Sequence, residues 1–257
     1  MINYEGILKT FIDKTAEIDL NVAIGNFTSI MKNVKIGRGT IIGNCVSINE
    51  GAIIGEGVRI DDNSVIGKRP IRAKWSVVQD LDIEKSLIIG NECLIGSHAV
   101  IYCGSKIGNY VLVADSASIR EKVVIGDFTI IGRNVTIEQK TIIGKKCKFE
   151  TACYITAYSL IEDFCFIAPM VITTNDNYLG RTEERKKHFK GITIRRGGRI
   201  GAGAVILPGI EINEDGVVGA GAVVTSNVPS KKIVVGVPAK VFSDVPVEQL
   251  LENQGWE

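Results

Sequence analysis

The chain has few of the residues from which common metal and redox sites are built. It contains two histidines, His98 and His188, among 257 residues. A zinc site with three histidine ligands therefore cannot be built, and we predict no metal. The six cysteines include no Cys-x-x-Cys pair. We expect neither structural zinc nor disulfides from such a pattern.

An excess of charge and long apolar runs are also missing. Lysine and arginine number 30 and aspartate and glutamate 29, which gives a net charge of +1. Without a global positive field, we expect no binding to nucleic acid or to an anionic membrane. No apolar run approaches the roughly 20 residues of a membrane span. The first residues lack the charged and apolar regions of a signal peptide. We therefore expect a cytoplasmic protein.

What the sequence has instead is a repeat of six residues. An apolar residue, mostly isoleucine and in one place Phe149, stands at every sixth position from Ile18 to Ile66, from Ile83 to Ile167 and from Ile194 to Val224. This period matches neither a helix, with about 3.6 residues per turn, nor the alternation of a strand, so it marks an internal repeat. We call the repeating apolar residues rungs. Three units would close an 18-residue coil with its rungs inside, so 30 rungs predict about ten coils.

Breaks in the repeat predict two inserted loops, at about 68–80 and 174–190. The end of such a column exposes its core and strand edges, so a cap is required there. We predict a β column over 1–240 and a helical cap over 241–257. A column of small residues lies four positions after the rungs. It includes four of the cysteines, which we predict to be packing residues: Cys93, Cys147, Cys153 and Cys165.

The motif of isoleucine or valine, then glycine and four variable residues resembles the hexapeptide-repeat, left-handed β-helix. The resemblance covers about 12–240, and the left hand comes from it alone, because the usual crossover rule favours the other hand. The predicted fold is all-β: a left-handed parallel β-helix of about ten coils with two inserted loops and a short C-terminal helix. The resemblance implies an acyltransferase that works as a homotrimer.

A column of polar residues follows one set of rungs at a spacing of 18. Its members are Glu84, Tyr102, Arg120, Glu138, Thr156 and Thr174. Residues one coil apart should stack along one corner of the column. The column is either a solvated edge with ion pairs or a groove wall that contacts a polar ligand. In the second case Tyr102, Arg120, Glu138, Thr156 and Thr174 bind substrate.

This column leads into the second loop, where the resemblance becomes closer. The segment from Ile172 to Ile212, together with VVGAGAVVTSNVP and VVGVPAKV, resembles acetyl-CoA-dependent N-acetyltransferases of nucleotide-linked amino sugars. Those acting on dTDP-3-amino-3,6-dideoxyhexoses are the best match. Relatives that modify galactosides have a histidine base where this chain has Asp176. The resemblance implies that Asn175 and Asp176 are catalytic and that Tyr178 and His188 bind substrate.

Two Gly-Ala-Gly-Ala segments in the last run lie 18 residues apart and should stack. Small residues expose backbone N–H and C=O groups along a smooth surface. In the family this surface binds the pantetheine arm of coenzyme A between two subunits, and a lysine in the last motif contacts its nucleotide end. The resemblance thus assigns acetyl-CoA as co-substrate and these cofactor-binding residues: Ala202, Gly203, Ala204, Ala220, Gly221 and Lys240.

The first loop, KRPIRAKWSVVQ, carries four cations and a tryptophan: Lys68, Arg69, Arg72, Lys74 and Trp75. These residues could hold a diphosphate and a base. A contact between subunits or a solvated hairpin is the alternative. The sequence leaves both open.

The predicted function is acetyl-CoA-dependent N-acetylation of a dTDP- or UDP-linked amino-deoxy sugar. One alternative is an O-acetyltransferase with His188 as base, and another is a β-helix scaffold without enzymatic activity. A γ-class carbonic anhydrase shares the β-helix but needs three zinc histidines, which this chain lacks.

Overall fold

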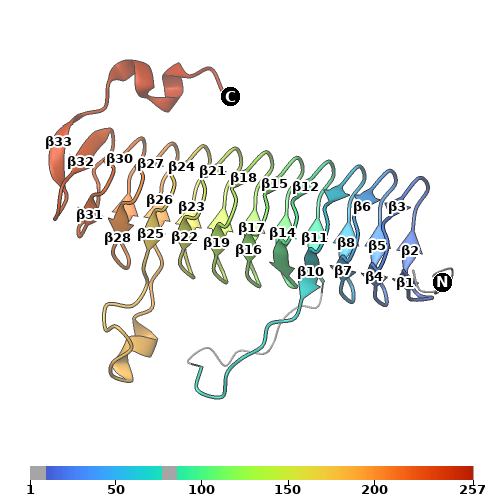
Figure 1. Cartoon of the computed structure of the whole chain (residues 1–257). Helices are drawn as coiled ribbons and strands as arrows, with labels where there is room; N and C mark the ends of the chain where they lie inside the picture. The colour runs from blue at the N-terminus through green and yellow to red at the C-terminus, as the bar shows by residue number, and fades with distance from the viewer. Residues whose placement is uncertain (1–9, 77–85, 257) are drawn as a thin grey trace, which may run out of the picture. The chain divides into compact units, whose positions relative to one another are not determined.

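The computed structural model describes residues 10–76 and 86–256. The chain divides into two compact units, Met1–Phe128 and Thr129–Glu257. Each unit is an all-β solenoid made of stacked coils of short parallel strands (Figure 1). The two units are described separately.

Within its described residues, the first unit contains seventeen strands, nearly all of two residues. They are β1 (Phe11–Ile12), β2 (Glu17–Ile18), β3 (Ala23–Ile24), β4 (Ser29–Ile30), β5 (Lys35–Ile36), β6 (Ile41–Ile42), β7 (Ser47–Ile48), β8 (Ile53–Ile54), β9 (Arg59–Ile60), β10 (Val65–Lys68), β11 (Ile88–Ile89), β12 (Leu94–Ile95), β13 (Val100–Tyr102), β14 (Lys106–Ile107), β15 (Leu112–Val113), β16 (Ser118–Ile119) and β17 (Val124–Ile125).

The strands of the first unit form three parallel sheets. The first sheet has the order β1-β4-β7-β10-β13-β16, the second β2-β5-β8-β11-β14-β17 and the third β3-β6-β9-β12-β15. The second residue of a two-residue strand is the rung and stacks on its equivalent in the next coil, as Ile30 does on Ile48. Side chains alternate between the two faces of a strand, so the preceding residue points outward. The predicted cycle of three strands per coil is thereby confirmed.

The corners between strands are stabilised by contacts from coil to coil. The Oδ1 atom of Asn44 accepts a hydrogen bond from the backbone N–H of Asn26 at 2.8 Å. A glycine after the rung is required because the next coil lies against it: a Cβ added at Gly25 would stand 2.5 Å from the carbonyl carbon of Gly43. The six-residue motif therefore encodes both the inward rung and the close stacking of coils.

The predicted rung Ile83 and the first member of the polar column, Glu84, lie outside the described residues. Among the described strands, β10 in the first sheet is followed by β11 in the second.

The second unit has the same cycle and ends in two 3₁₀ helices. Its elements are β18 (Ile130–Ile131), β19 (Thr136–Ile137), β20 (Ile142–Ile143), β21 (Lys148–Phe149), β22 (Tyr154–Ile155), β23 (Leu160–Ile161), β24 (Phe166–Ile167), β25 (Ile172–Thr173), η1 (Glu184–Lys187), β26 (Thr193–Ile194), β27 (Arg199–Ile200), β28 (Val205–Ile206), β29 (Glu211–Ile212), β30 (Val217–Val218), β31 (Val223–Val224), β32 (Lys232–Val235), β33 (Lys240–Asp244), η2 (Val247–Gln249) and η3 (Leu251–Asn253).

In this unit the first sheet is β19-β22-β25-β28-β31, the second β20-β23-β26-β29 and the third β18-β21-β24-β27-β30-β32-β33. The cycle among the described residues runs to β32, slightly more than the predicted 30 rungs, because Ile12, Thr173 and Val234 also occupy rung positions. The handedness of the coil stays a prediction.

The C-terminal end differs from the predicted helical cap over 241–257. Lys240–Asp244 forms an antiparallel strand on β32. The helical part begins only at Val247. A residue before proline is driven toward extended backbone, so Val245, before Pro246, cannot start a helix. The antiparallel strand instead pairs the backbone groups that β32 would otherwise leave open at the sheet edge.

The cysteines of the small-residue column are buried, as predicted. Cys93, Cys147, Cys153 and Cys165 are each at most 1% exposed. The Sγ atom of Cys147 lies 3.0 Å from the carbonyl oxygen of Glu162 in the next coil. Burial raises the pKa of the Cys153 thiol to about 12. These are packing residues rather than nucleophiles.

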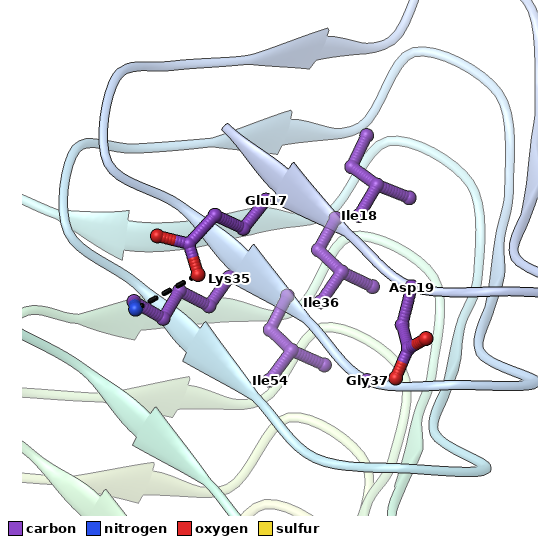
Figure 2. A pocket seen from close by; sticks show the side chains of 7 residues that line it. All are labelled: Glu17, Ile18, Asp19, Lys35, Ile36, Gly37 and Ile54. Carbon is purple, nitrogen blue, oxygen red and sulfur yellow. Dashed lines mark hydrogen bonds and ion pairs between the residues drawn. The ribbon is translucent and has the colours of Figure 1, made fainter. Parts of the chain in front are cut away.

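The first coils of the first unit contain a hollow of about 410 Å³ (Figure 2). It is lined by the rungs Ile18, Ile36 and Ile54 from three successive coils and by the ion pair between Lys35 and Glu17, 2.9 Å long. The rung Ile12 is 45% exposed, whereas Ile30, one coil further, is fully buried.

Of the helices that the structure describes, none is both long and apolar enough to cross a membrane.

Candidate functional site

The second loop leaves its unit where β25 ends, and its base is held by the following coil. The backbone N–H and the hydroxyl of Thr174 both donate to the carbonyl oxygen of Ile206, each at 3.1 Å. The loop closes where the N–H of Lys190 donates to the carbonyl oxygen of Asn175 at 3.3 Å. The N–H of Gly209 in turn donates to the carbonyl of Lys190 at 3.1 Å. Asn175 and Asp176 thus begin a loop with a fixed entry and exit.

Asp176 has both carboxylate oxygens occupied. Oδ1 accepts the N–H of Tyr178 at 2.8 Å, and Oδ2 accepts the N–H of Gly180 at 3.0 Å and Arg185 Nη1 at 3.2 Å. Partial burial alone would raise the pKa of Asp176, but these hydrogen bonds and the guanidinium outweigh it and hold the pKa below its ordinary value. The carboxylate therefore stays ionised and is a weak base. It organises the loop start.

His188 lies at the end of η1 in the same loop. Its Nε2 is 3.2 Å from Oε1 of Glu184, and its ring stacks on Tyr178 with 5.8 Å between centroids. The His188 and Glu184 side chains are each 53% exposed. A carboxylate beside imidazole can fix its tautomer. This histidine can therefore accept a proton from a solvent-exposed group.

The part of the polar column in the second unit is less open than the sequence predicted. Glu138 is half-buried, and Thr156 is only 2% exposed. The N–H of Thr156 donates to the hydroxyl of Thr173 at 2.8 Å, and its carbonyl accepts from Ser159. Thr156 therefore offers almost no surface to a substrate and is a core residue of the corner. Thr174 is also half-buried, and its hydroxyl already donates a hydrogen bond to the carbonyl oxygen of Ile206.

The two Gly-Ala segments stack as predicted. They are turns between the third and first sheets, and the N–H of Gly221 donates to the carbonyl of Ala202 at 2.9 Å. A Cβ added at Gly201 would be 2.5 Å from the nitrogen of Ala220, so the two backbones touch there. At Gly203 and Gly221 an added Cβ would meet nothing within 4 Å. These turns therefore present a backbone surface that opens outward.

Within this surface the residues differ. Ala202 and Ala220 are exposed, whereas Ala204 is fully buried and turns its methyl group into the core. Ala204 thus supports the turn and cannot meet a ligand with its side chain. The tail approaches the second turn: the N–H of Ala239 donates to the carbonyl of Val223 at 2.8 Å. Lys240, the next residue, is exposed at the start of β33.

The catalytic and cofactor residues of the prediction lie at opposite ends of the first-sheet strands of this unit. The loop follows β25, whereas the Gly-Ala turns precede β28 and β31. Asp176 and Gly203 therefore lie at different corners of the coil.

The remaining predicted residues, Tyr102 and Arg120, belong to the first unit. Arg120 lies over the Tyr102 ring, with its Cζ 4.8 Å from the centroid, and its Nε donates to Glu121 at 3.0 Å. Glu121 is 2% exposed and also receives a hydrogen bond from Arg72 of the first loop. The sequence analysis missed Glu121. Its position beside Arg120, a member of the polar column, was the available signal.

In the part of the chain that the structure describes, no three His, Cys, Asp or Glu residues cluster as metal ligands.

Comparisons with known proteins agree with this architecture. Residues 86–114 and 191–226 match a family model described as the hexapeptide repeat of succinyl-transferase. No curated protein matches the sequence. The structure of an Arabidopsis UDP-N-acetylglucosamine acyltransferase is similar, with a TM-score of 0.64 and 19% identity over 95% of this chain and 75% of that chain.

Two further structures match with lower scores. The UDP-N-acetylglucosamine acyltransferase from Campylobacter jejuni has a TM-score of 0.49 and 16% identity, over 91% of this chain and 73% of that one. A maltose O-acetyltransferase from Clostridium difficile 630 has a TM-score of 0.41 and 22% identity, over 50% and 69%. These two structures carry no further argument. The matched repeats and the Arabidopsis structure support a hexapeptide-repeat β-helix.

Proposed function

We propose that the protein transfers an acetyl group from acetyl-CoA to the amino group of a nucleotide-linked amino-deoxy sugar, and that it acts as a homotrimer. The observation that carries this proposal is the state of Asp176. The position of the expected histidine base holds an ionised carboxylate whose oxygens are already hydrogen-bonded. Such a site suits a nucleophile that needs little activation, and an amine needs less than a hydroxyl.

The proposed reaction is a nucleophilic acyl transfer. The neutral amine nitrogen attacks the thioester carbonyl carbon, and a tetrahedral intermediate forms. The carbon–sulfur bond then breaks, the amide forms, and the amine proton passes to the coenzyme A thiolate, directly or through water. Asn175 and the loop start ordered by Asp176 hold the acceptor. Proximity and orientation supply most of the acceleration in such a scheme.

The Gly-Ala turns are the proposed coenzyme surface. The open space at Gly203 and Gly221 leaves room for the pantetheine arm beside exposed backbone groups. Lys240 offers a positive charge for a phosphate of the nucleotide end. The acceptor loop follows β25, whereas these turns precede β28 and β31, so they lie at opposite ends of the first-sheet strands. In the proposed homotrimer, the turns of a neighbouring subunit complete the site.

The similarity to an Arabidopsis UDP-N-acetylglucosamine acyltransferase supports a nucleotide-linked sugar as acceptor. The test is a panel of dTDP- and UDP-linked amino sugars with acetyl-CoA, with thiol release as readout. Matched sugars with a hydroxyl in place of the amine are included. Turnover only with amines supports the proposal, whereas turnover only with hydroxyl acceptors contradicts it.

The second candidate function, O-acetylation, rests on one contact. Nε2 of His188 lies 3.2 Å from Glu184 on the exposed face of the second loop, so this pair could deprotonate a sugar hydroxyl. Under this alternative His188→Ala would abolish turnover. Under N-acetylation the same variant would keep most of its activity.

A further inference from the structure

The first loop is attached to the first unit by an ion pair that is almost completely buried. Arg72 donates to Oε1 of Glu121, and the two side chains are 10% and 3% exposed. Arg120 donates to Oε2 of the same carboxylate at 3.0 Å. Burial alone would raise the pKa of Glu121, but the hydrogen bonds from Arg72, from its own backbone and from Arg120 keep that pKa below its ordinary value. One carboxylate is thus shared by two guanidinium groups.

Tyr102 lies beside this cluster, between two cations. The Nζ atom of Lys68 is 5.4 Å from the ring centroid, and the Cζ atom of Arg120 is 4.8 Å from it. Lys68 pairs with Tyr102 in register, because Gly67, with a φ of 75°, introduces a bulge into β10. Arg120 comes from the strand on the other side of β13. The phenol ring therefore separates two positive charges along one corner.

Two of these cations, Lys68 and Arg72, have donors without a partner among the described residues. Lys68 makes no ion pair with any residue that the structure describes. The Nε atom of Arg72 is buried and has no hydrogen-bond partner in the described chain. Lys68 and Tyr102 are half-buried and the Arg72 side chain is only 10% exposed, so water screens their charges and dipoles less than at an open surface. Cations in such surroundings attract an anion.

The tip of the same loop adds an aromatic surface. Trp75 follows Arg72 by three residues, and 94% of its surface is exposed. An indole ring near a cationic cluster can stack on a nucleobase whose phosphates contact the cations. Diphosphate esters of nucleosides contain both parts. The two sources with this chemistry are a nucleotide-linked sugar and coenzyme A.

We propose that Lys68, Arg72 and Tyr102 bind the diphosphate group of a nucleotide and that Trp75 contacts its base. This inference goes beyond the proposed function, because it concerns binding by the first unit and holds whatever group the second unit transfers. Arg120 and Glu121 hold the site in place. Arg120 fixes the ring, and Glu121 anchors the loop.

Binding is measured by tryptophan fluorescence and titration calorimetry at constant ionic strength. The chain has two tryptophans, Trp75 and Trp256, so a Trp256→Phe background isolates the loop signal. The probes are inorganic pyrophosphate, UDP, dTDP and coenzyme A. Pyrophosphate should bind without changing the Trp75 signal, whereas the nucleotide that occupies the site should quench it.

Three variants separate a built site from general charge. Lys68→Met removes a cation that makes no ion pair and should weaken nucleotide binding about tenfold. Lys106→Met makes the same charge change on the exposed outer face of the first unit and should leave affinity unchanged. Glu121→Gln removes the carboxylate charge that anchors Arg72 and should weaken nucleotide binding.

Each result decides for or against the proposal. The ligand of the site is identified as the nucleotide whose affinity falls in Lys68→Met while the affinity for the other nucleotide does not change. Equal losses in Lys68→Met and Lys106→Met would reduce the effect to net charge and overturn the site. Absence of binding by any probe at about 10 mM would overturn it as well. Lys68→Met alone carries the test if Glu121→Gln does not fold.

Discussion

The two inserted loops interrupt the repeat in the same way but are held in place by different interactions. Each leaves its own unit at the end of a first-sheet strand, after β10 or after β25. The first loop is attached through the buried carboxylate of Glu121, which belongs to a strand corner and receives Arg72. The second loop is closed mainly by its own residues: Asp176 accepts bonds from Tyr178, Gly180 and Arg185 of the same loop.

This difference predicts which property, stability or activity, a substitution in each loop should affect. A buried charge pair between a loop and its unit contributes to the free energy of unfolding of that unit. Breaking the pair therefore destabilises the fold. A self-contained, largely exposed loop can lose its internal order at little cost to the unit below it. Stability should therefore be sensitive to the first loop, and activity to the second.

The largest effect is expected from Arg72→Met. The variant leaves Glu121 buried with Arg120 as its remaining guanidinium partner, and we expect the free energy of unfolding of the first unit to fall by about 3 kcal/mol. The matched control is Arg69→Met in the same loop, because Arg69 pairs with Glu50 at the exposed surface and should cost less than about 1 kcal/mol. Urea denaturation measures both. Equal losses would mean that the loop is not attached through Glu121.

Asp176 tests the second loop. Asp176→Ala removes three hydrogen bonds from the loop start, and kcat/KM should fall about 100-fold while the midpoint of thermal unfolding changes little. Asp176→Asn keeps an acceptor for the N–H of Tyr178 and should retain more activity than the alanine variant. Steady-state kinetics on the best acceptor measure both. A general base would instead lose as much in Asn as in Ala, so equal losses would contradict the positioning role.

Gly203→Trp tests the coenzyme surface of the second unit. Its side chain would fill the open space above the turn, and the KM for acetyl-CoA should rise at least about tenfold. Gly203 has a φ of 66°, so any side chain there adds backbone strain. Gly39→Trp is the matched control, because Gly39 has a φ of 71° and also nothing within 4 Å of an added Cβ. If both variants leave the KM unchanged, coenzyme A binds elsewhere.

The pH dependence of stability sharpens the contrast between the loops. The pKa of Glu121 is lowered in the folded state, so its contribution is complete above its ordinary value of 4.5 and is lost as the pH falls through the folded value. The advantage of the wild type over Glu121→Gln should therefore shrink below about pH 4.5. Denaturant midpoints from pH 7 to pH 3 measure it. A constant difference across that range would contradict a charge-based anchor.

The smallest effect is expected from His188→Ala. The ring stacks on Tyr178 at the surface and is half exposed, so its loss should lower kcat/KM less than about threefold and leave stability unchanged. Tyr178→Leu is the companion variant that removes the other ring. A loss of 100-fold or more in His188→Ala alone would instead favour O-acetylation with a histidine base.

Much of the fold could be predicted because its code is local. The rungs, the glycines after them and the small column that contains Cys147 repeat with a fixed spacing, and each unit contacts its neighbours in the same way. The positions of both loops follow from that spacing. The predicted rung at Ile83 lies outside the described residues and stays a prediction.

The candidate site was less predictable, since spacing places a residue on a corner without fixing its surroundings. Spacing put Thr156 in a polar column, and the family resemblance put Ala204 in a coenzyme surface. Both are buried, because side chains at neighbouring positions of a corner turn in different directions. The state of Asp176 depends on Arg185, nine residues away in an irregular loop. No periodic rule describes such a contact.

The sequence by itself determined the six-residue period, the three-strand coil, the packing of the cysteines and the places where the repeat breaks. Tertiary structure alone decided that β33 closes the sheet edge and that Arg72 reaches Glu121 across 49 residues of sequence. The reason is physical. Rung stacking repeats from coil to coil and so leaves a periodic trace in the sequence. The contact of a buried charge with its partner occurs only at one place and depends on the path of an irregular loop, so it leaves no periodic trace.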